Sequence, residues 1–581
     1  MSADRLLAHY HRIADAPDAV AQLRSFVLDL AVRGKLMAQD AGDEPVAALL
    51  KRISAEKGRL VRAGRARAPK AATALAAEDM PFSLPGSWRW SQLAEVGLLG
   101  PRNDVADDAT ASFVPMTLIA AEFSVAHGHE TRPWGEVKKG YTHFRDGDVG
   151  LAKITPCFEN GKSTVFQNLT GGVGSGTTEL HIVRPLLVDP TYILIFLKCP
   201  HFIETGIPRM TGTAGQKRVP TEYFAFSPFP LPPLAEQHRI VAKVGELMAL
   251  CDRLEAARGA REAARDRLAA ASLARLNAPD PAAFVPHARF AINTLPALTT
   301  RPDQIKALRQ TILNLAVRGT LVAQDSGDEP AHRWLKRINA EITAYAAENR
   351  LTTRGVREIA EPLYPFDVPA GWSWSRLHQL FLTVTDGDHL PPPRADEGVA
   401  FLTIGNISTG SIDFTNCRLV PIEYFQALQA YRTPRRGDIL YTVVGATYGR
   451  PVLVETDRPF CVQRHIAILK PPPSANRRFL ALMLGSPYIY EQATRGITGT
   501  AQPTVALGPL RQFLVPVPPM CEQHRIVAKV DALMALCDRL EASLTTGNDT
   551  RRHLLDALLA EALAPGADVA SAEIAHVAAD A

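Results

Sequence analysis

Several short patterns in the sequence could support catalysis, but each lacks a residue that its chemistry needs. Gly161-Lys162-Ser163-Thr164 ends like a phosphate-binding loop, yet a proline stands at position 156, where the loop needs a glycine to form its backbone nest. Glu136-Val137-Lys138 matches the end of a nuclease carboxylate–lysine motif, but so short a match is common by chance. No His-Glu-x-x-His zinc motif and no Asn/Asp-Pro-Pro-aromatic tetrapeptide of the amino-methyltransferase kind occurs. We therefore expect a non-catalytic chain that holds no cofactor or metal.

The composition is that of a folded protein with several domains. At roughly 100–200 residues per domain, the 581 residues allow about three to five domains. Apolar residues make up 46%, charged residues 21%, and the net charge is +4. The cysteine count is seven, an odd number without a Cys-x-x-Cys pair, which argues against a disulfide framework. The N-terminus lacks a signal-peptide layout, and no apolar run reaches the ~18–20 residues of a membrane helix. We expect a cytoplasmic protein without a membrane partner.

Two repeated blocks decide the predicted architecture. Residues 23–53 match residues 308–338 at 20 of 31 positions, and residues 230–256 match residues 516–542 at 22 of 27 positions. The offsets of 285 and 286 residues are far longer than the period of a solenoid repeat. The chain is therefore predicted to be a duplicated two-domain unit with an internal pseudo-two-fold repeat.

The second repeated block predicts a long helix in each half. Its apolar residues follow a 4-3-4-3 spacing, the a/d seam of a coiled coil. Two helices with equal seams are expected to pair, antiparallel because a globular domain lies between them; two ordinary amphipathic core helices are the alternative. The expected interface residues of the helix pair are Ile240, Val244, Leu247, Cys251, Leu254, Ile526, Val530, Leu533, Cys537 and Leu540.

Between the repeats lie two diverged regions, predicted to be variable domains of mixed α/β structure, in which Trp88, Trp90, Trp372 and Trp374 are core residues. The expected fold class is α+β, with two mixed α/β domains separated by two long helices paired as an antiparallel coiled coil. Short apolar runs predict strands at Leu180–Val183, Tyr192–Leu197, Ile439–Val444 and Ile466–Leu469. The expected segments are an N-terminal helical region (1–79), the first variable domain (80–232), a central long helix (233–278), a Pro-rich linker (279–305), a repeated helical region (306–364), the second variable domain (365–517), a distal long helix (518–562) and a loose tail (563–581).

This order of segments resembles the DNA-specificity subunits of type I restriction–modification systems. The resemblance covers nearly the whole chain, and its most specific part is the doubled junction, PLPPLAEQ and PVPPMCEQ, that opens each long helix. It implies that each variable domain is a target-recognition domain reading one half of a split, asymmetric site on double-stranded DNA, and that the helix pair sets the spacer. It also implies two methyltransferase subunits that use S-adenosylmethionine, and restriction/translocase subunits that use ATP and Mg.

The resemblance also points to polar loop segments as the readers of DNA. Guanine is recognised by Arg or Lys, adenine by Asn or Gln, and the thymine methyl group by Thr, Ser or small apolar groups. Each such residue could instead be an ordinary solvated loop residue, and Gly147-Asp148 and Gly437-Asp438 are expected to be turns before strands. The candidate DNA-binding residues are Lys153, Thr155, Asn160, Lys162, Ser163, Gln216, Lys217 and Arg218 in the first domain, and His389, Asn406, Tyr448, Arg450, Gln502 and Thr504 in the second.

The charge of the variable domains is lower than expected for free-standing DNA-binding domains. Residues 81–232 hold 13 Lys/Arg against 14 Asp/Glu, and residues 365–517 hold 14 against 11. Because phosphate neutralisation dominates non-specific affinity, we expect weak DNA binding by this chain alone. Two other functions stay open: an enzyme that modifies or cleaves DNA by itself, and a pseudo-symmetric scaffold or methyltransferase inhibitor that reads no sequence.

Overall fold

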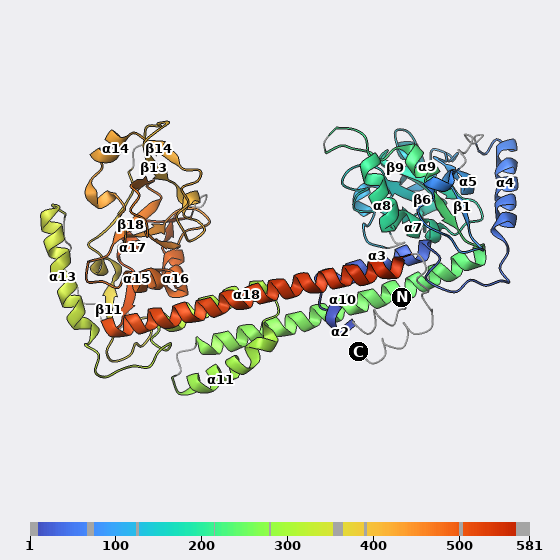
Figure 1. Ribbon diagram of the computed structural model, residues 1–581. Helices are drawn as coiled ribbons and strands as arrows, with labels where there is room; N and C mark the ends of the chain where they lie inside the picture. The colour runs from blue at the N-terminus through green and yellow to red at the C-terminus, as the bar shows by residue number, and fades with distance from the viewer. Residues whose placement is uncertain are drawn as a thin grey trace. The chain divides into compact units, whose positions relative to one another are not determined.

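The computed structural model describes residues 10–66, 75–123, 127–213, 215–277, 281–351, 364–388, 392–498 and 503–564 (Figure 1). The chain forms two compact units. Unit 1 holds residues 1–261 together with 547–581, and unit 2 holds residues 262–546. Two long helices, α10 (Leu234–Leu276) and α18 (Met520–Leu563), each begin in one unit and end in the other.

In unit 1, three N-terminal helices precede the first variable domain. Pro45 immediately precedes α4, the last of these three helices. The helices are α2 (Tyr10–Ile13), α3 (Ala19–Val32), α4 (Val46–Arg62), α5 (Leu93–Val96), α6 (Trp134–Val137), α7 (Pro190–Lys198), α8 (Pro200–Gly206) and α9 (Thr221–Phe226). The strands are β1 (Arg89–Ser91), β2 (Gly97–Leu99), β3 (Thr110–Val114), β4 (Glu130–Pro133), β5 (Thr142–Arg145), β6 (Val149–Ala152), β7 (Ser163–Val165), β8 (Val173–Gly176), β9 (Leu180–Pro185) and β10 (Phe229–Leu231).

Unit 2 follows the same order, with its own helices before the second variable domain. The helices are α11 (Pro281–Leu298), α12 (Pro302–Val317), α13 (Ala331–Glu348), α14 (Ile422–Ala427), α15 (Arg477–Leu484), α16 (Pro487–Arg495) and α17 (Leu507–Arg511). The strands are β11 (Ser373–Arg376), β12 (Thr383–Asp386), β13 (Val399–Leu402), β14 (Arg418–Val420), β15 (Ile439–Thr442), β16 (Pro451–Leu453), β17 (Phe460–Val462), β18 (Ile466–Lys470), β19 (Ile497–Thr498), β20 (Thr504–Val505) and β21 (Leu514–Val517).

The two variable domains share an antiparallel sheet of the same strand order and differ in the size of a second, mixed sheet. A four-stranded antiparallel sheet has the order β2-β9-β6-β7 in unit 1 and β12-β18-β15-β16 in unit 2. A second, mixed sheet contains one parallel pair, β3–β8 in unit 1 and β13–β17 in unit 2. The first and last strands of each domain pair antiparallel, β1 with β10 and β11 with β21, so the chain enters and leaves each domain at one place.

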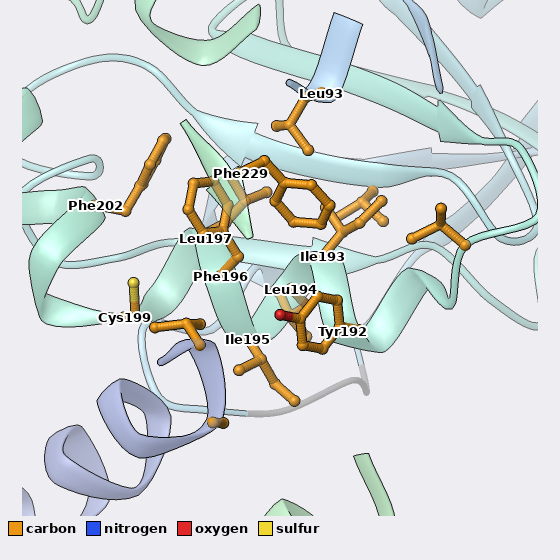
Figure 2. Close-up of a cluster of buried hydrophobic side chains, with 14 of the residues drawn as sticks. Leu93, Tyr192, Ile193, Leu194, Ile195, Phe196, Leu197, Cys199, Phe202 and Phe229 are labelled. Atoms are coloured by element: carbon orange, nitrogen blue, oxygen red, sulfur yellow. The ribbon is translucent and has the colours of Figure 1, made fainter. Parts of the chain in front are cut away.

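One predicted strand is a helix. The run Tyr192–Leu197 lies within α7, and Figure 2 shows its side chains on a helix that packs in a buried cluster with Phe202 and Phe229. All six residues of the run are buried, so their periodicity could not separate a strand from a core helix. The deciding signal is Asp189, whose carboxylate accepts from the N–H groups of Thr191 and Tyr192 as the N-cap. The predicted strands at Leu180, Ile439 and Ile466 are confirmed as β9, β15 and β18.

Within the predicted linker 279–305, α11 occupies Pro281–Leu298, and the linker itself stays a prediction. The first described residue of α11 is a proline, a residue that suits the first turn of a helix because its missing N–H needs no partner there. Ala291 of α11 packs with Leu273 and Leu276 at the end of α10. The tail beyond residue 564 lies outside the described residues, and the other predicted segment boundaries stay predictions.

The repeated sequence blocks form the same clip at the start of each long helix. In unit 2, Trp372 Nε1 donates to Glu522 Oε2 over 3.0 Å, and Gln324 Nε2 donates to Glu522 Oε1 over 2.9 Å. Arg525 pairs with Asp328 over 2.5 Å. Gln523 Nε2 donates to the carbonyl oxygen of Pro518, just before α18 begins. The Glu-Gln-x-Arg sequence thus joins the repeated loop, the variable domain and the long helix.

Unit 1 repeats this clip with weaker hydrogen bonds. Gln39 Nε2 donates to Glu236 Oε1 over 3.3 Å, and the buried Trp88 lies beside the same carboxylate without a well-formed bond. Arg239 pairs with Asp43 over 2.6 Å. Burial raises the pKa of both carboxyls, Glu236 and Glu522, above its ordinary value. Trp88 and Trp372 are thus confirmed as core residues.

The seam of each long helix is buried within its own unit. Ile240 and Val244 belong to a core cluster with Val27 and Leu28 of α3. Ile526, Val530 and Cys537 belong to the equivalent cluster with α12, joined at its margin by Leu533 and Leu540. Arg24 of α3 pairs with Asp252 and Glu255 of α10. Arg309 of α12 likewise pairs with Asp538 and Glu541 of α18. The seam thus has a partner helix in each unit, and pairing of α10 with α18 stays a prediction.

Candidate nucleic-acid interface

A buried ion pair fixes the strand that leads to the polar loops of each variable domain. Gly147 (φ 86°) and Gly437 (φ 91°) are left-handed turn residues before β6 and β15, as predicted. In unit 1, the fully buried Asp148 accepts two hydrogen bonds from Arg184 of β9, both over 2.8 Å. In unit 2, Lys470 of β18 donates to Asp438 over 2.5 Å.

Three loop segments meet beyond the end of β6 in unit 1, and we call residues 153–160, 177–179 and 215–218 loop edge 1. Backbone hydrogen bonds join them: Lys153 N to Glu179 O, Thr155 N to Lys217 O, and Val219 N to Lys153 O. Arg218 also donates two hydrogen bonds to Glu179, both over 2.9 Å, and this lowers the pKa of the Glu179 carboxyl. The two predicted reading segments of the first domain therefore lie side by side.

Unit 2 contains the same arrangement beyond the end of β15, and we call residues 443–450, 463–465 and 503–504 loop edge 2. Its backbone bonds run from Val443 N to His465 O, from Gly445 N to Pro503 O, and from Val505 N to Val443 O. These join positions equivalent to those of loop edge 1, although few of the side chains agree. The two domains thus share one scaffold for a solvent-facing edge and differ in what that edge presents.

Most of the predicted DNA-binding residues lie on these edges with part of the side chain in solvent. Asn160, Gln216, Lys217 and Arg450 are exposed. The residues of intermediate exposure are Lys153, Thr155, Lys162, Arg218 and Thr504. Several of these side chains are engaged within the domain. Lys162 Nζ donates to Met116 O, Thr155 Oγ1 donates to Lys217 O, and Arg218 binds Glu179. The exposed Arg450 donates to Ser408 O over 2.6 Å. His389 and Gln502 lie outside the described residues.

Three of the predicted DNA-binding side chains are buried. Ser163, the first residue of β7, is fully buried, and its hydroxyl donates to Gly161 O over 3.1 Å. Asn406 is 8% exposed, because its amide closes a loop by binding Thr403 N and Asp413 O. Tyr448 is 9% exposed, with its hydroxyl bound to Thr494. Polar residue type alone could not distinguish these structural roles from base contacts.

The structure also adds residues that the sequence reading missed. The turn before β9 and its equivalent before β18 bring Thr177 and Thr178 to loop edge 1, and Gln463 and Arg464 to loop edge 2. No motif marks these short turns. Aligning the two halves of the sequence on Arg184 and Lys470 would have shown that these two turns occupy equivalent positions.

A buried lysine supports loop edge 1 from behind. Lys198, the last residue of α7, donates to Gly161 O over 2.9 Å, Ala121 O over 3.0 Å and Ala120 O over 3.3 Å. Burial lowers its pKa to about 7. The equivalent helix of unit 2, α15, contains no lysine, so this support is particular to the first domain.

Known proteins resemble this chain over most of its length. Residues 393–546 match the family model described as the type I restriction modification DNA specificity domain. The chain is 35% identical over 548 residues to the type I restriction enzyme EcoAI specificity subunit of Escherichia coli, and the alignment covers 93% of each chain. The chain belongs to the family of type I restriction–modification specificity subunits.

Two further comparisons agree with this membership. The EcoEI specificity subunit of Escherichia coli is 37% identical to this specificity subunit over 558 residues, 94% of each chain. A solved structure concerned with complex assembly and conformational transition of the type I R-M system covers 84% of this specificity subunit and 100% of that chain, with a TM-score of 0.50 and 20% identity. The α+β fold is thereby confirmed. Membership of this family also confirms the prediction of a non-catalytic, DNA-binding specificity subunit.

The described residues were also compared with the requirements of a metal site and of a membrane-spanning helix. Within those residues, no three His, Cys, Asp or Glu side chains gather as a metal site. No helix among them is long and apolar enough to cross a membrane.

Proposed function

We propose that each loop edge reads one half of a bipartite, asymmetric DNA site. The observation that supports this is the pair of equivalent backbone networks, which hold two solvent-facing edges in one geometry while their side chains differ. Base recognition needs such a fixed frame with variable Arg, Lys, Asn, Gln and Thr side chains at its surface. Two unlike edges in one chain correspond to two unlike half-sites.

The two long helices are proposed to set the gap between the half-sites. They contain 43 and 44 residues, and at 1.5 Å per residue each is about 65 Å long. Their pairing as an antiparallel coiled coil would fix the spacing, and their exposed faces would dock two methyltransferase subunits. Those subunits would supply S-adenosylmethionine chemistry, and restriction/translocase subunits would supply ATP- and Mg-dependent cleavage.

The decisive experiment is to co-express this chain with its cognate methyltransferase subunit and to map methylated adenines across a genome by single-molecule sequencing. A motif with two unlike halves and a fixed gap is expected. Exchange of residues 365–517 for the second variable domain of another specificity subunit should change one half of the motif and leave the other half and the methylation level unchanged.

One outcome of this experiment would contradict the proposed function. A stable complex with the methyltransferase that yields no sequence motif would contradict sequence reading and favour the scaffold or inhibitor function. The chain alone should bind DNA weakly and with strong salt dependence, because partner subunits would supply much of the phosphate contact. Filter binding of a cognate and a random duplex at two salt concentrations checks this.

A further inference from the structure

The turn between β17 and β18 brings an exposed arginine to the middle of loop edge 2. It consists of Gln463, Arg464 and His465, and the carbonyl of His465 accepts from Val443 N in the backbone network. Arg464 is exposed, and its Nε lies 3.4 Å from Nε2 of His465. Among the described residues, no carboxylate lies within ion-pair distance of Arg464.

Several other arginines of the second variable domain are held by internal acceptors. Arg436 pairs with Asp457, Arg432 donates to Gly387 O, and Arg511 donates twice to Val384 O. Arg418 donates to Pro392 O. Arg464 therefore differs from these in keeping most of its five N–H donors available to a ligand.

The equivalent turn of unit 1 has the opposite character. Thr178 occupies the position of Arg464, and Glu179 occupies the position of His465. Glu179 binds Arg218, so the arginine of loop edge 1 is neutralised inside the edge. His465 has no negative charge with which to neutralise Arg464, and burial and the arginine itself lower the pKa of its imidazole, which favours the neutral form. The same backbone position thus presents a neutral threonine in one domain and, in the other, an exposed arginine without a carboxylate partner among the described residues.

We propose that Arg464 is a specificity-determining residue that reads a guanine in the half-site of the second domain. The guanidinium fork matches O6 and N7 of guanine in the major groove, and a rigid turn held by a backbone hydrogen bond can aim it. A phosphate contact would use the same charge but carry no sequence information. The proposal rests on the proposed function of loop edge 2 and adds the base and the residue.

The test compares the wild-type methyltransferase complex with complexes that contain Arg464→Ala or Arg464→Lys. Methylation is measured on duplexes in which each base pair of the mapped motif is changed in turn. Arg464→Ala is expected to lower methylation of the cognate site by roughly 5- to 150-fold and to remove discrimination at one G·C pair of the second half-site only. Arg464→Lys should restore part of that discrimination.

Arg436→Ala is the matched control, because Arg436 is an exposed arginine of the same domain that is already paired with Asp457. It should change neither the methylation rate nor the motif. A uniform loss across all sequences in Arg464→Ala, with a flatter salt dependence, would assign Arg464 to a phosphate and overturn the proposal, as would a second half-site without a G·C pair. If the wild-type complex yields no bipartite motif, the proposed function itself fails, whatever Arg464 does.

Discussion

Loop edge 1 and loop edge 2 share their main-chain contacts and differ in their charges. Three backbone hydrogen bonds join equivalent positions in both edges. Arg218 of loop edge 1 pairs with Glu179, whereas Arg464 of loop edge 2 has no carboxylate partner among the described residues. Main-chain bonds do not depend on side-chain identity, so the edge keeps its geometry while its surface changes. The comparison shows how one scaffold can present two different recognition surfaces.

The buried ion pairs and the clips have the same role in both units, but their hydrogen bonds differ. Asp148 receives a bidentate arginine fork, and Asp438 receives a lysine. Glu522 accepts two well-formed bonds in its clip, and Glu236 accepts one long bond. Four substitutions test whether these differences carry energetic weight.

The largest effect is expected for Asp148→Ala and Asp438→Ala. Each leaves a buried cation without its carboxylate, which costs about 3–5 kcal/mol of unfolding free energy. Urea denaturation of the purified chain measures the loss. Asp457→Ala removes a partner whose side chain is 78% exposed and should leave the unfolding free energy nearly unchanged. Equal effects in all three variants would show that burial of the first two pairs is not what matters.

Next in size is Glu522→Gln, because the amide offers one acceptor to the two donors Trp372 and Gln324. The loss should be about 1–3 kcal/mol, and Glu236→Gln should cost less because only one bond is affected. Thermal unfolding of the two variants side by side gives the difference. A larger loss of stability for Glu236→Gln would contradict the prediction that the clip of unit 2 is the more stabilising of the two.

The clip should also respond to pH. Burial raises the folded-state pKa of Glu522 above that of the unfolded chain, so the folded state binds this proton more tightly. The stabilisation that comes from this tighter proton binding is fully present at low pH. It is lost as pH rises through the folded-state pKa of Glu522. The stability of the wild type relative to Glu522→Gln should therefore fall as pH rises from about 4, where unfolded glutamates ionise. Denaturation midpoints across that range report the slope.

Lys198→Met tests the support that only loop edge 1 has. Lost hydrogen bonds and relieved desolvation of the ammonium oppose each other, so the net change in unfolding free energy should be about 1 kcal/mol. Amide exchange should nonetheless speed up in residues 116–121 and 157–162, which the lysine joins. Unchanged exchange there would mean that the backbone network alone holds the loop.

The smallest effect on stability is expected for Arg218→Ala. The pair with Glu179 is partly exposed, so its loss should leave the unfolding free energy nearly unchanged. Faster amide exchange at residues 215–218 is the expected sign.

The sequence predicted the frame better than the edges. The repeats placed both long helices, because identical residues at a fixed offset imply identical structure. Tyr192–Leu197 was assigned to a strand because a fully buried run has no periodicity to read. Prolines suggested a linker where α11 begins, although proline suits the first turn of a helix. Ser163 and Tyr448 have the chemistry of DNA readers, but only the packing around them shows that they face inward.

The pairing of the first strand of each variable domain with its last has an entropic consequence. Neighbouring strands lie about 5 Å apart, so the frame meets each domain at what is nearly a single point. An insertion inside the domain then lengthens a closed loop, whose free-energy cost grows only with the logarithm of its length, about 0.6 kcal/mol per doubling. The helical frame need not move, and a domain can change in size as well as in sequence without strain elsewhere in the chain.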